Sequence, residues 1–498
     1  MIYDYWKPVA DTGPDPRRRT RMRVLCGLAL ACGALVATAM AQEWPDRSRP
    51  PALGPAPRLD LPPIQTRTLS NGLPVWLIET HEVPLVQVSV VVRAGSGDDP
   101  PGKFGVASLT AAMLDEGAGT RSALEIADTV DFLGATLSTA ATFDASTVRV
   151  SVPASRLHEA LPVIANVALR PTFPEADLKR LRQERITSLL QVRDDPASIA
   201  ALGFARIVFG NSHRYGTASS GTKATLQAFS PQDLRAFHSA FYRPSNAALV
   251  VVGDVSADAV LADLEQHFGG WKASAAVVRR SVPVAKQLTR GRVYIIDKPG
   301  AEQSEIRIGW VGVPRSTPDY FAIVVLNTVL GGSFTSRLNQ NLREKNGYTY
   351  GALSAFDMRA SAGPFVAAAG VQTDKTAAAL AEFFGEFARI GTPVAADELA
   401  KARNYVSLGL PARFETSGDL SRRMEELFVY GLPEDYFDRY VANVQAVTAD
   451  AVRDAAAEHI QAARFAVVVA GDREKIEADI RALKLAPVRV MTVEEALD

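Results

Sequence analysis

One segment of this chain occurs twice, and the repetition limits the folds open to it. FSPQDLRAFHSAFYRPSNAALVVVGD begins at Phe229, and VTADAVRDAAAEHIQAARFAVVVAGD begins at Val447. The two segments align without a gap, and both have the pattern of a helix, a turn, a buried strand and a closing Gly-Asp pair. Because a shared pattern of this length is typical of internal duplication, the sequence predicts two related halves.

Each half alternates short apolar strands with amphipathic helices. The apolar spacing predicts strands at 73–79 and 85–92 and a helix at 104–115 in the first half; it predicts strands at 292–297 and 305–312 and helices at 319–330 and 335–345 in the second. A chain of 498 residues is also too long for one core. We therefore expect an α+β fold, with two homologous α+β domains in which helices pack on an antiparallel sheet.

Shifts in composition divide the chain into five regions. We expect a signal peptide at 1–41, a Pro-rich leader at 42–61, an N-terminal domain at 62–273, a linker at 274–290 and a C-terminal domain at 291–498.

The N-terminus has the composition of an export signal. Several arginines precede an apolar run at 24–39, which ends in small residues suited to cleavage near Ala41. The sequence predicts an exported, periplasmic protein. Two alternatives stay open: the segment is kept as a membrane anchor, or translation starts at Met22 rather than Met1.

Charge and hydropathy exclude two classes of partner. The formal net charge is -1, so no basic field would attract nucleic acid. No apolar run of about 20 residues follows the N-terminal segment, so we expect no stable membrane span in the mature chain. Both cysteines, Cys26 and Cys32, lie inside the export signal, which leaves the mature chain without thiol chemistry.

A glycine-rich stretch at 331–356 stands out in the second half. Gly331 and Gly332 interrupt an apolar segment, and Ser333 is placed to cap the helix predicted at 335–345. We expect a tight turn, a short helix and then a strand.

Arg343 and Tyr350 are the candidate chemical groups of this stretch. Arg343 falls on the last turn of the predicted helix, and Tyr350 falls seven residues later in a strand predicted at 349–357. A chain reversal between them could bring a guanidinium beside a phenol, which suits binding of a peptide carbonyl or its oxyanion. The structural alternative is that Arg343 pairs with a surface carboxylate and Tyr350 packs in the core.

Several segments together resemble the pitrilysin/insulinase family of inverted-motif zinc peptidases. They are LSNGLPVWLIE, VRAGSGDDP, FGVASLTAAMLDEGAGTRS, FYRPSNAALVVVGD and GGSFTSRLNQNLREKNGYTYG. The resemblance covers the chain from about residue 66 to residue 483. It implies two homologous α+β halves and an involvement in peptide hydrolysis.

The chain departs from this family at its metal motif. Active members carry H-x-x-E-H, in which two histidines bind zinc and the glutamate is the base. Here the corresponding ligand positions are Ser108 and Ala112, and the base position is Ala111. The third ligand position is Gln191, seven residues after Glu184, which resembles the family's upstream acid. Zinc needs about three strong protein donors, so we expect no metal in this chain.

The other half of the family's active site is retained. The resemblance implies that Arg343 and Tyr350 hold the substrate backbone, with the Gly331-Gly332 turn beside it. Some bacterial members divide the work between a zinc-binding chain and a chain that keeps only the Arg/Tyr pair. The resemblance therefore implies a heterodimer or larger complex with an H-x-x-E-H subunit that holds the zinc. The complex, rather than either chain alone, would cleave unfolded peptides.

Two alternatives come from other classes of protein. The chain could be a non-catalytic scaffold, or it could bind extended peptides by adding them to a sheet edge. A separate metal site is disfavoured because no two of the six histidines have helical metal-pair spacing. His81-Glu82, at a predicted turn, is the remaining weak ligand candidate.

Overall fold

The computed structural model describes residues 60–272 and 282–497, which all belong to one unit of the chain. The predicted signal peptide, nearly all of the predicted leader and part of the predicted linker lie outside these residues. Within the described residues, no helix combines the length and the apolarity needed to cross a membrane.

The first half contains a six-stranded sheet in the order β1-β2-β8-β3-β7-β6. Its strands are β1 (Gln65–Thr68), β2 (Pro74–Glu79), β3 (Leu85–Val92), β6 (Thr136–Ala141), β7 (Ser146–Pro153) and β8 (Ala247–Gly253). All neighbours pair antiparallel except β2 and β8, which pair parallel. Every residue of β8 is buried, which explains why its sequence is apolar throughout rather than alternating.

The second half contains a six-stranded sheet in the order β11-β12-β10-β13-β9-β14. Its strands are β9 (Arg292–Asp297), β10 (Gln303–Val311), β11 (Ala352–Phe356), β12 (Pro364–Gln372), β13 (Ala466–Gly471) and β14 (Val488–Met491). Strand β9 pairs parallel with β13 and β14, and the other pairs are antiparallel.

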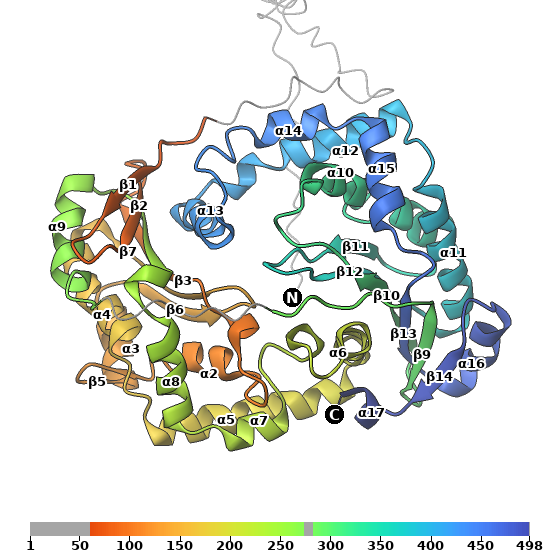
Figure 1. Ribbon diagram of the computed structural model, residues 1–498, viewed down its shortest axis with the longest axis horizontal. Helices are drawn as coiled ribbons and strands as arrows, with labels where there is room; N and C mark the ends of the chain where they lie inside the picture. The colour runs from red at the N-terminus through yellow and green to blue at the C-terminus, as the bar shows by residue number, and fades with distance from the viewer. Residues whose placement is uncertain (1–59, 273–281, 498) are drawn as a thin grey trace, which may run out of the picture. The chain divides into compact units, whose positions relative to one another are not determined.

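The two sheets repeat one topology except at one edge, where β1 pairs antiparallel with β2 but β14 pairs parallel with β9. Strands β2 and β9, β3 and β10, and β7 and β12 begin 218 residues apart in the sequence. Each pair occupies corresponding places in its sheet, and both sheets are predominantly antiparallel with helices packed on them (Figure 1). The predicted α+β class and the predicted duplication are therefore confirmed.

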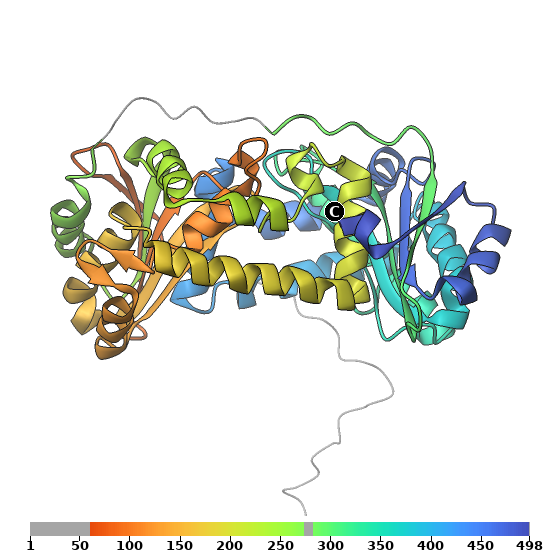
Figure 2. The same cartoon turned by 90° about the horizontal axis from the view of Figure 1, so that it is seen from below.

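The helices follow the same repeat. Those of the first half are α2 (Val106–Ala112), α3 (Ala123–Phe132), α4 (Leu157–Leu169), α5 (Glu175–Gln191), α6 (Pro196–Phe209), α7 (Lys223–Ala228), α8 (Pro231–Phe241) and α9 (Ala257–Phe268). Those of the second are α10 (Tyr320–Leu330), α11 (Thr376–Arg389), α12 (Ala396–Leu408), α13 (Ser417–Tyr430), α14 (Tyr440–Ala446), α15 (Ala449–His459), α16 (Arg473–Ala482) and α17 (Val493–Leu497). Helix α5 is a long, straight rod that leads to α6 (Figure 2).

Helix α6 packs on the sheet of the other half. Ile199 and Phe204 of α6 belong to a buried cluster with Ile296 and Val468 of the second sheet. Gly203 permits this approach, because a Cβ there would lie 2.7 Å from the Cδ1 atom of Ile296. The first half thus contributes a helix to the core of the second.

Helix α13 makes the reciprocal contact with the first sheet. Leu420, Met424 and Phe428 pack against Val91 and Val250, and burying each large side chain contributes about 1.5–3 kcal/mol. The polar contacts at this junction include Ser89 Oγ to Ser421 Oγ at 3.0 Å, Arg149 Nε to Glu425 Oε1 at 2.8 Å and Arg93 Nε to the Phe428 carbonyl at 3.0 Å. The two halves are joined by exchanged helices as well as by the predicted linker.

Candidate functional site

A buried ion pair positions the start of helix α2, which carries the degenerate metal motif. The Asp99 carboxylate accepts hydrogen bonds from the backbone amides of Gly105 at 2.6 Å and Ala107 at 2.9 Å. Arg214 donates to the same carboxylate at 2.9 Å, and the two side chains are 0% and 3% exposed. Burial raises the pKa of Asp99 to about 6, although Arg214 and the two backbone amides each lower this pKa. The carboxylate is therefore ionised at pH 7.

Arginine contacts the first ligand position on α2. Arg185 of α5 donates to the Ser108 hydroxyl at 3.1 Å and to the Ser108 carbonyl at 2.9 Å. Burial lowers the pKa of Arg185, but a guanidinium stays protonated at neutral pH. The position that would carry a zinc-binding imidazole is therefore held by a cation, which repels a second cation.

The remaining positions of the motif offer no better donors. The methyl groups of Ala111 and Ala112 cannot bind a metal or take a proton, and Gln191 is an exposed neutral amide at the end of α5. Glu184 accepts from Arg180 at 3.1 Å. The donor set of this motif does not fit zinc, which requires about three imidazole, thiolate or carboxylate ligands.

Restoring the motif tests the role of Arg185. We expect Ser108→His/Ala111→Glu/Ala112→His/Gln191→Glu to bind well under one zinc per chain while Arg185 is present, because the guanidinium both repels the ion and anchors the ligand helix. Adding Arg185→Ala should raise zinc affinity at least tenfold, measured by calorimetry and metal analysis of the dialysed protein. Lys179→Ala removes an exposed cation from the same helix and serves as the matched control. Equal zinc binding with and without Arg185 would contradict this assignment.

The Gly331-Gly332 turn is explained by close packing. A Cβ on Gly331 would lie 2.4 Å from the backbone nitrogen of Ser354, and one on Gly332 would lie 2.7 Å from Asn327 Nδ2. Ser333 does not cap the next helix as predicted, because that helix begins only at Arg337; the Ser333 hydroxyl instead donates to the Thr328 carbonyl at 3.2 Å. Gly331 therefore lets the turn approach strand β11, and Gly332 lets it approach the last turns of helix α10.

Asn339 is a positioning residue that the sequence analysis missed. Its Nδ2 donates to the carbonyls of Ser333 at 3.1 Å and Ala352 at 2.8 Å, and its Oδ1 accepts from the Ala352 amide at 2.9 Å. A buried side-chain amide therefore fastens the turn, the helix and β11 together. The sequence signal was a polar residue on the inner side of the predicted helix, one position from Leu338.

The helix that carries Arg343 is wider than an α-helix. Residues Asn339–Lys345 form a π-helix, and the Asn346 amide bonds to the Asn341 carbonyl five residues back at 3.1 Å. Single π-type turns occur frequently at functional sites. The Arg343 guanidinium lies 3.6 Å from the ring centre of Phe334 and pairs with Glu344. The predicted pairing of Arg343 with a carboxylate is thus present.

Tyr350 lies in the loop before β11 rather than in a strand, since the strand begins at Ala352. Its side chain is 93% exposed, so the alternative that it packs in the core is wrong. Among the described residues no hydrogen bond joins the side chains of Arg343 and Tyr350, both of which are donors that a peptide carbonyl could accept from. Their proposed substrate role stays a prediction.

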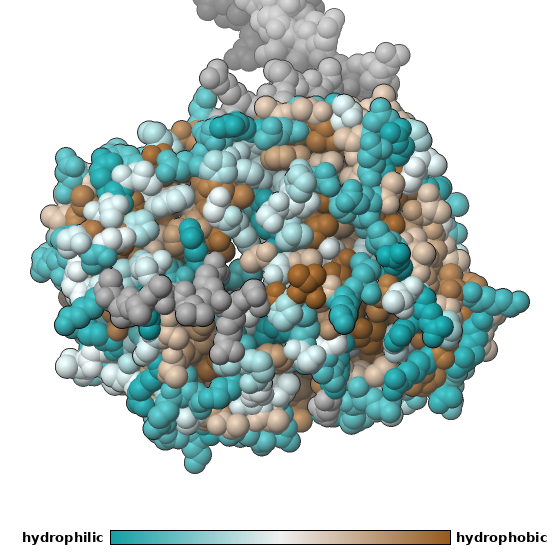
Figure 3. Space-filling model, in the orientation of Figure 1, coloured by the Kyte–Doolittle hydropathy of each residue, from teal (hydrophilic) through white to brown (hydrophobic). Residues whose placement is uncertain are grey.

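Exposed apolar side chains concentrate around this stretch. Phe334 is 65% exposed and Leu353 is 48% exposed, in addition to Tyr350. The face shown in Figure 3 carries hydrophilic and hydrophobic residues interspersed with one another. The stretch at 331–356 therefore presents a local apolar surface around Arg343.

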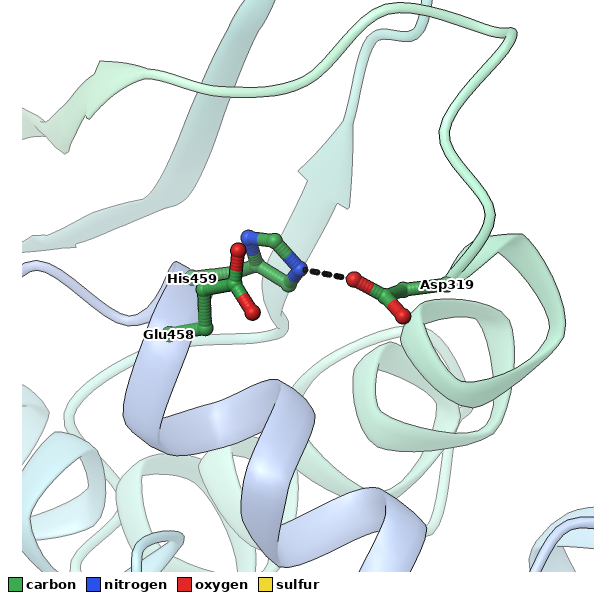
Figure 4. A group of neighbouring side chains, drawn as sticks. All are labelled: Asp319, Glu458 and His459. Atoms are coloured by element: carbon green, nitrogen blue, oxygen red, sulfur yellow. Dashed lines mark hydrogen bonds and ion pairs between the residues drawn. The ribbon is translucent and has the colours of Figure 1, made fainter.

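A group of three potential metal ligands lies apart from the degenerate motif. His459 Nε2 lies 3.0 Å from Asp319 Oδ2, with the Glu458 carboxylate alongside (Figure 4). The sequence analysis missed this pair because the two residues are far apart in the chain. The His459 carbonyl also accepts from Trp310 Nε1 at 2.9 Å, so this histidine ties α15 to α10 and β10.

His81, the weak ligand candidate, contacts Asp254. Its Nδ1 lies 2.7 Å from Asp254 Oδ1. The contact joins the loop after β2 to the end of β8, which gives His81 a structural role.

Comparison with known proteins gives consistent similarities. The model described as "Insulinase (Peptidase family M16)" matches residues 75–201, and that described as "Peptidase M16 inactive domain" matches residues 228–406. An uncharacterized zinc protease of Mycobacterium tuberculosis is 28% identical over 432 residues, covering 84% of this chain and 96% of the relative.

Solved structures show the same architecture. A peptidase M16 inactive domain from Pseudomonas fluorescens has a TM-score of 0.76 at 26% identity and covers 82% of this chain and 98% of that chain. A protease from Helicobacter pylori has a TM-score of 0.77 at 20% identity, covering 82% of this chain and 100% of that chain, which supports the fold alone.

Proposed function

Because this chain belongs to peptidase family M16, the insulinase family, we propose that it is the substrate-binding subunit of a heteromeric zinc metallopeptidase. The observation that carries the proposal is the 93% exposed phenol of Tyr350 in a chain whose metal position is held by Arg185. An exposed hydroxyl such as that of Tyr350 can stabilise the oxyanion of a hydrolysis reaction when another subunit supplies the metal that activates water.

The partner in this proposal is a family member with an intact H-x-x-E-H motif, which would hold the zinc. The zinc would supply the activation of water. Arg343 and Tyr350 of this chain bind the carbonyl of an unfolded peptide and donate to the negative charge that develops on its oxygen. Stacking on Phe334 limits the orientations of the Arg343 guanidinium. Such fixed donors stabilise the transition state because they need little reorganisation. We also propose that the complex acts in the periplasm after export of both chains.

A non-catalytic scaffold is the second candidate. It is favoured by the packing of Gly331 and Gly332, since close backbone contacts alone account for both glycines. A scaffold would keep the fold and the exposed apolar surface but would not depend on the Tyr350 hydroxyl.

Coexpression with an intact H-x-x-E-H relative, encoded beside this chain where such a gene exists, tests the proposal. We expect the two chains to coelute in gel filtration and to cleave unfolded peptides only when both are present. Each chain alone is the control. A complex whose activity equals that of the partner alone would support the scaffold, and failure to associate would contradict both candidates.

A further inference from the structure

A cavity of about 470 Å³ lies in the second half beside the Gly331-Gly332 turn. Helices α10 and α12, the start of α14 and the segment after β11 form its walls. The side chains that determine its chemistry are Tyr320, Phe356, Met358, Tyr405, Arg413 and Tyr440. Its volume is within the roughly 300–1,000 Å³ of sites that hold small ligands or single side chains.

The internal repeat places this cavity at the counterpart of the degenerate metal site. Helices α2 and α10 each follow the strand that lies third from the edge strand β6 or β11, and α5 and α12 are each the second helix after β7 or β12. In the first half, Arg185 of α5 bonds directly to Ser108 of α2. In the second half, α10 and α12 instead leave a cavity between them, lined by Asn327 and Thr328.

The polar groups of the cavity favour an anion. Arg413 is exposed, and the described part of the chain offers its guanidinium no ion-pair partner. Asn327 Oδ1 accepts from Ser354 Oγ at 2.8 Å, which leaves the amide NH₂ group as its donor. The Thr328 hydroxyl donates to the Val324 carbonyl at 2.8 Å. No carboxylate is among the described residues that line this cavity.

The apolar walls favour a large flat group. The rings of Tyr320 and Tyr440 meet edge to face, with centroids 6.4 Å apart, and Tyr405 is 53% exposed. Aromatic walls bind aromatic side chains through offset or edge contacts. A guanidinium beside them binds carboxylates, often through two parallel hydrogen bonds. The complementary ligand therefore carries a carboxylate on an aromatic or large apolar group.

We infer that this cavity binds the C-terminal residue of a peptide, with its carboxylate on Arg413 and an aromatic side chain against the tyrosines that line the wall. The inference rests on the proposed peptide-binding function. Gly332 belongs both to the cavity wall and to the turn that precedes the helix of Arg343. The same carboxylate chemistry could come from a free aromatic acid.

Binding to the purified full chain, without a partner, tests the inference. The probes are a fluorescent decapeptide ending in phenylalanine, the same peptide as its C-terminal amide, and N-acetylphenylalanine. We expect the amide to bind roughly 10- to 100-fold more weakly than the acid, since hydrogen bonds to charged groups are the stronger class. Arg413→Ala should reduce binding of the acid by the same factor and leave the amide unchanged. Arg453→Ala removes a cation from α15 that does not line the cavity, and it is the matched control.

Three outcomes would overturn the inference. The first is equal affinity for the peptide acid and the peptide amide, and the second is unchanged affinity for the acid in Arg413→Ala. The third is an affinity for N-acetylphenylalanine as high as that for the peptide, which would assign the cavity to small aromatic acids. Thr328→Trp, which fills the cavity, should abolish acid binding in a protein with unchanged circular dichroism. Cleavage by the heteromeric complex is measured separately, so that the proposed function can stand when this inference fails.

Discussion

Tyr350→Phe should lower kcat of the heteromeric peptidase by roughly 10²–10³-fold, the effect of removing one donor from an oxyanion site. The change deletes a single hydroxyl from a side chain that is 93% exposed. It should therefore leave assembly with the partner and the melting temperature unchanged. Arg343→Ala should reduce kcat by a similar factor, and kcat/KM should fall with it because the donors act in the transition state.

Matched variants separate this catalytic effect from simple loss of charge or surface. Arg343→Lys keeps the positive charge but loses the planar fork, and we expect it to recover only part of the activity. Lys345→Ala removes an exposed cation from the same helix and should stay near wild type. Full activity of Tyr350→Phe within a stable complex would remove the substrate role of Tyr350 and favour the scaffold.

Asp99→Ala should destabilise the chain by about 3–5 kcal/mol, the usual cost of breaking a buried ion pair from one side. Arg214, whose side chain is 3% exposed, would keep a buried charge without its carboxylate. The amides of Gly105 and Ala107 would also lose their acceptor at the start of α2. Urea denaturation followed by circular dichroism measures the change.

Two further variants make this stability test specific. Asp128→Ala removes an exposed carboxylate from α3 and should change stability by no more than about 0.5 kcal/mol. Asp99→Leu/Arg214→Met replaces both charges, and we expect it to be more stable than Asp99→Ala because no buried charge remains. A loss below about 1 kcal/mol in Asp99→Ala would show that water or other groups replace the carboxylate.

The packing partners of the exchanged helices α6 and α13 could not be predicted from the sequence. The apolar faces of α6 and α13 are visible as periodic patterns, but the patterns do not say which sheet they cover. Both sheets have central strands whose residues are buried on both faces. A helix with an apolar stripe could pack on either one. The polar contacts of Ser421 and Glu425, which lie far from their partners in the chain, help to select the first sheet for α13.

The candidate site divides in the same way. The loss of the zinc ligands at Ser108 and Ala112, and of the base at Ala111, follows from the sequence, because its resemblance to the family assigns a residue to each position of the motif. That Arg185 holds Ser108, and that Tyr350 faces solvent, depends on how α5 packs against α2 and where β11 begins.

The sequence by itself therefore determined the duplication and the α+β class, since repeats and apolar periodicity are present in the order of the residues. Its resemblance to the family also showed that the motif lacks zinc-binding side chains. The tertiary structure alone decided the helix exchange, the arginine at the ligand position, the Asp99–Arg214 pair and the cavity between α10 and α12. Each of these depends on contacts between residues far apart in the chain, which local patterns leave undetermined.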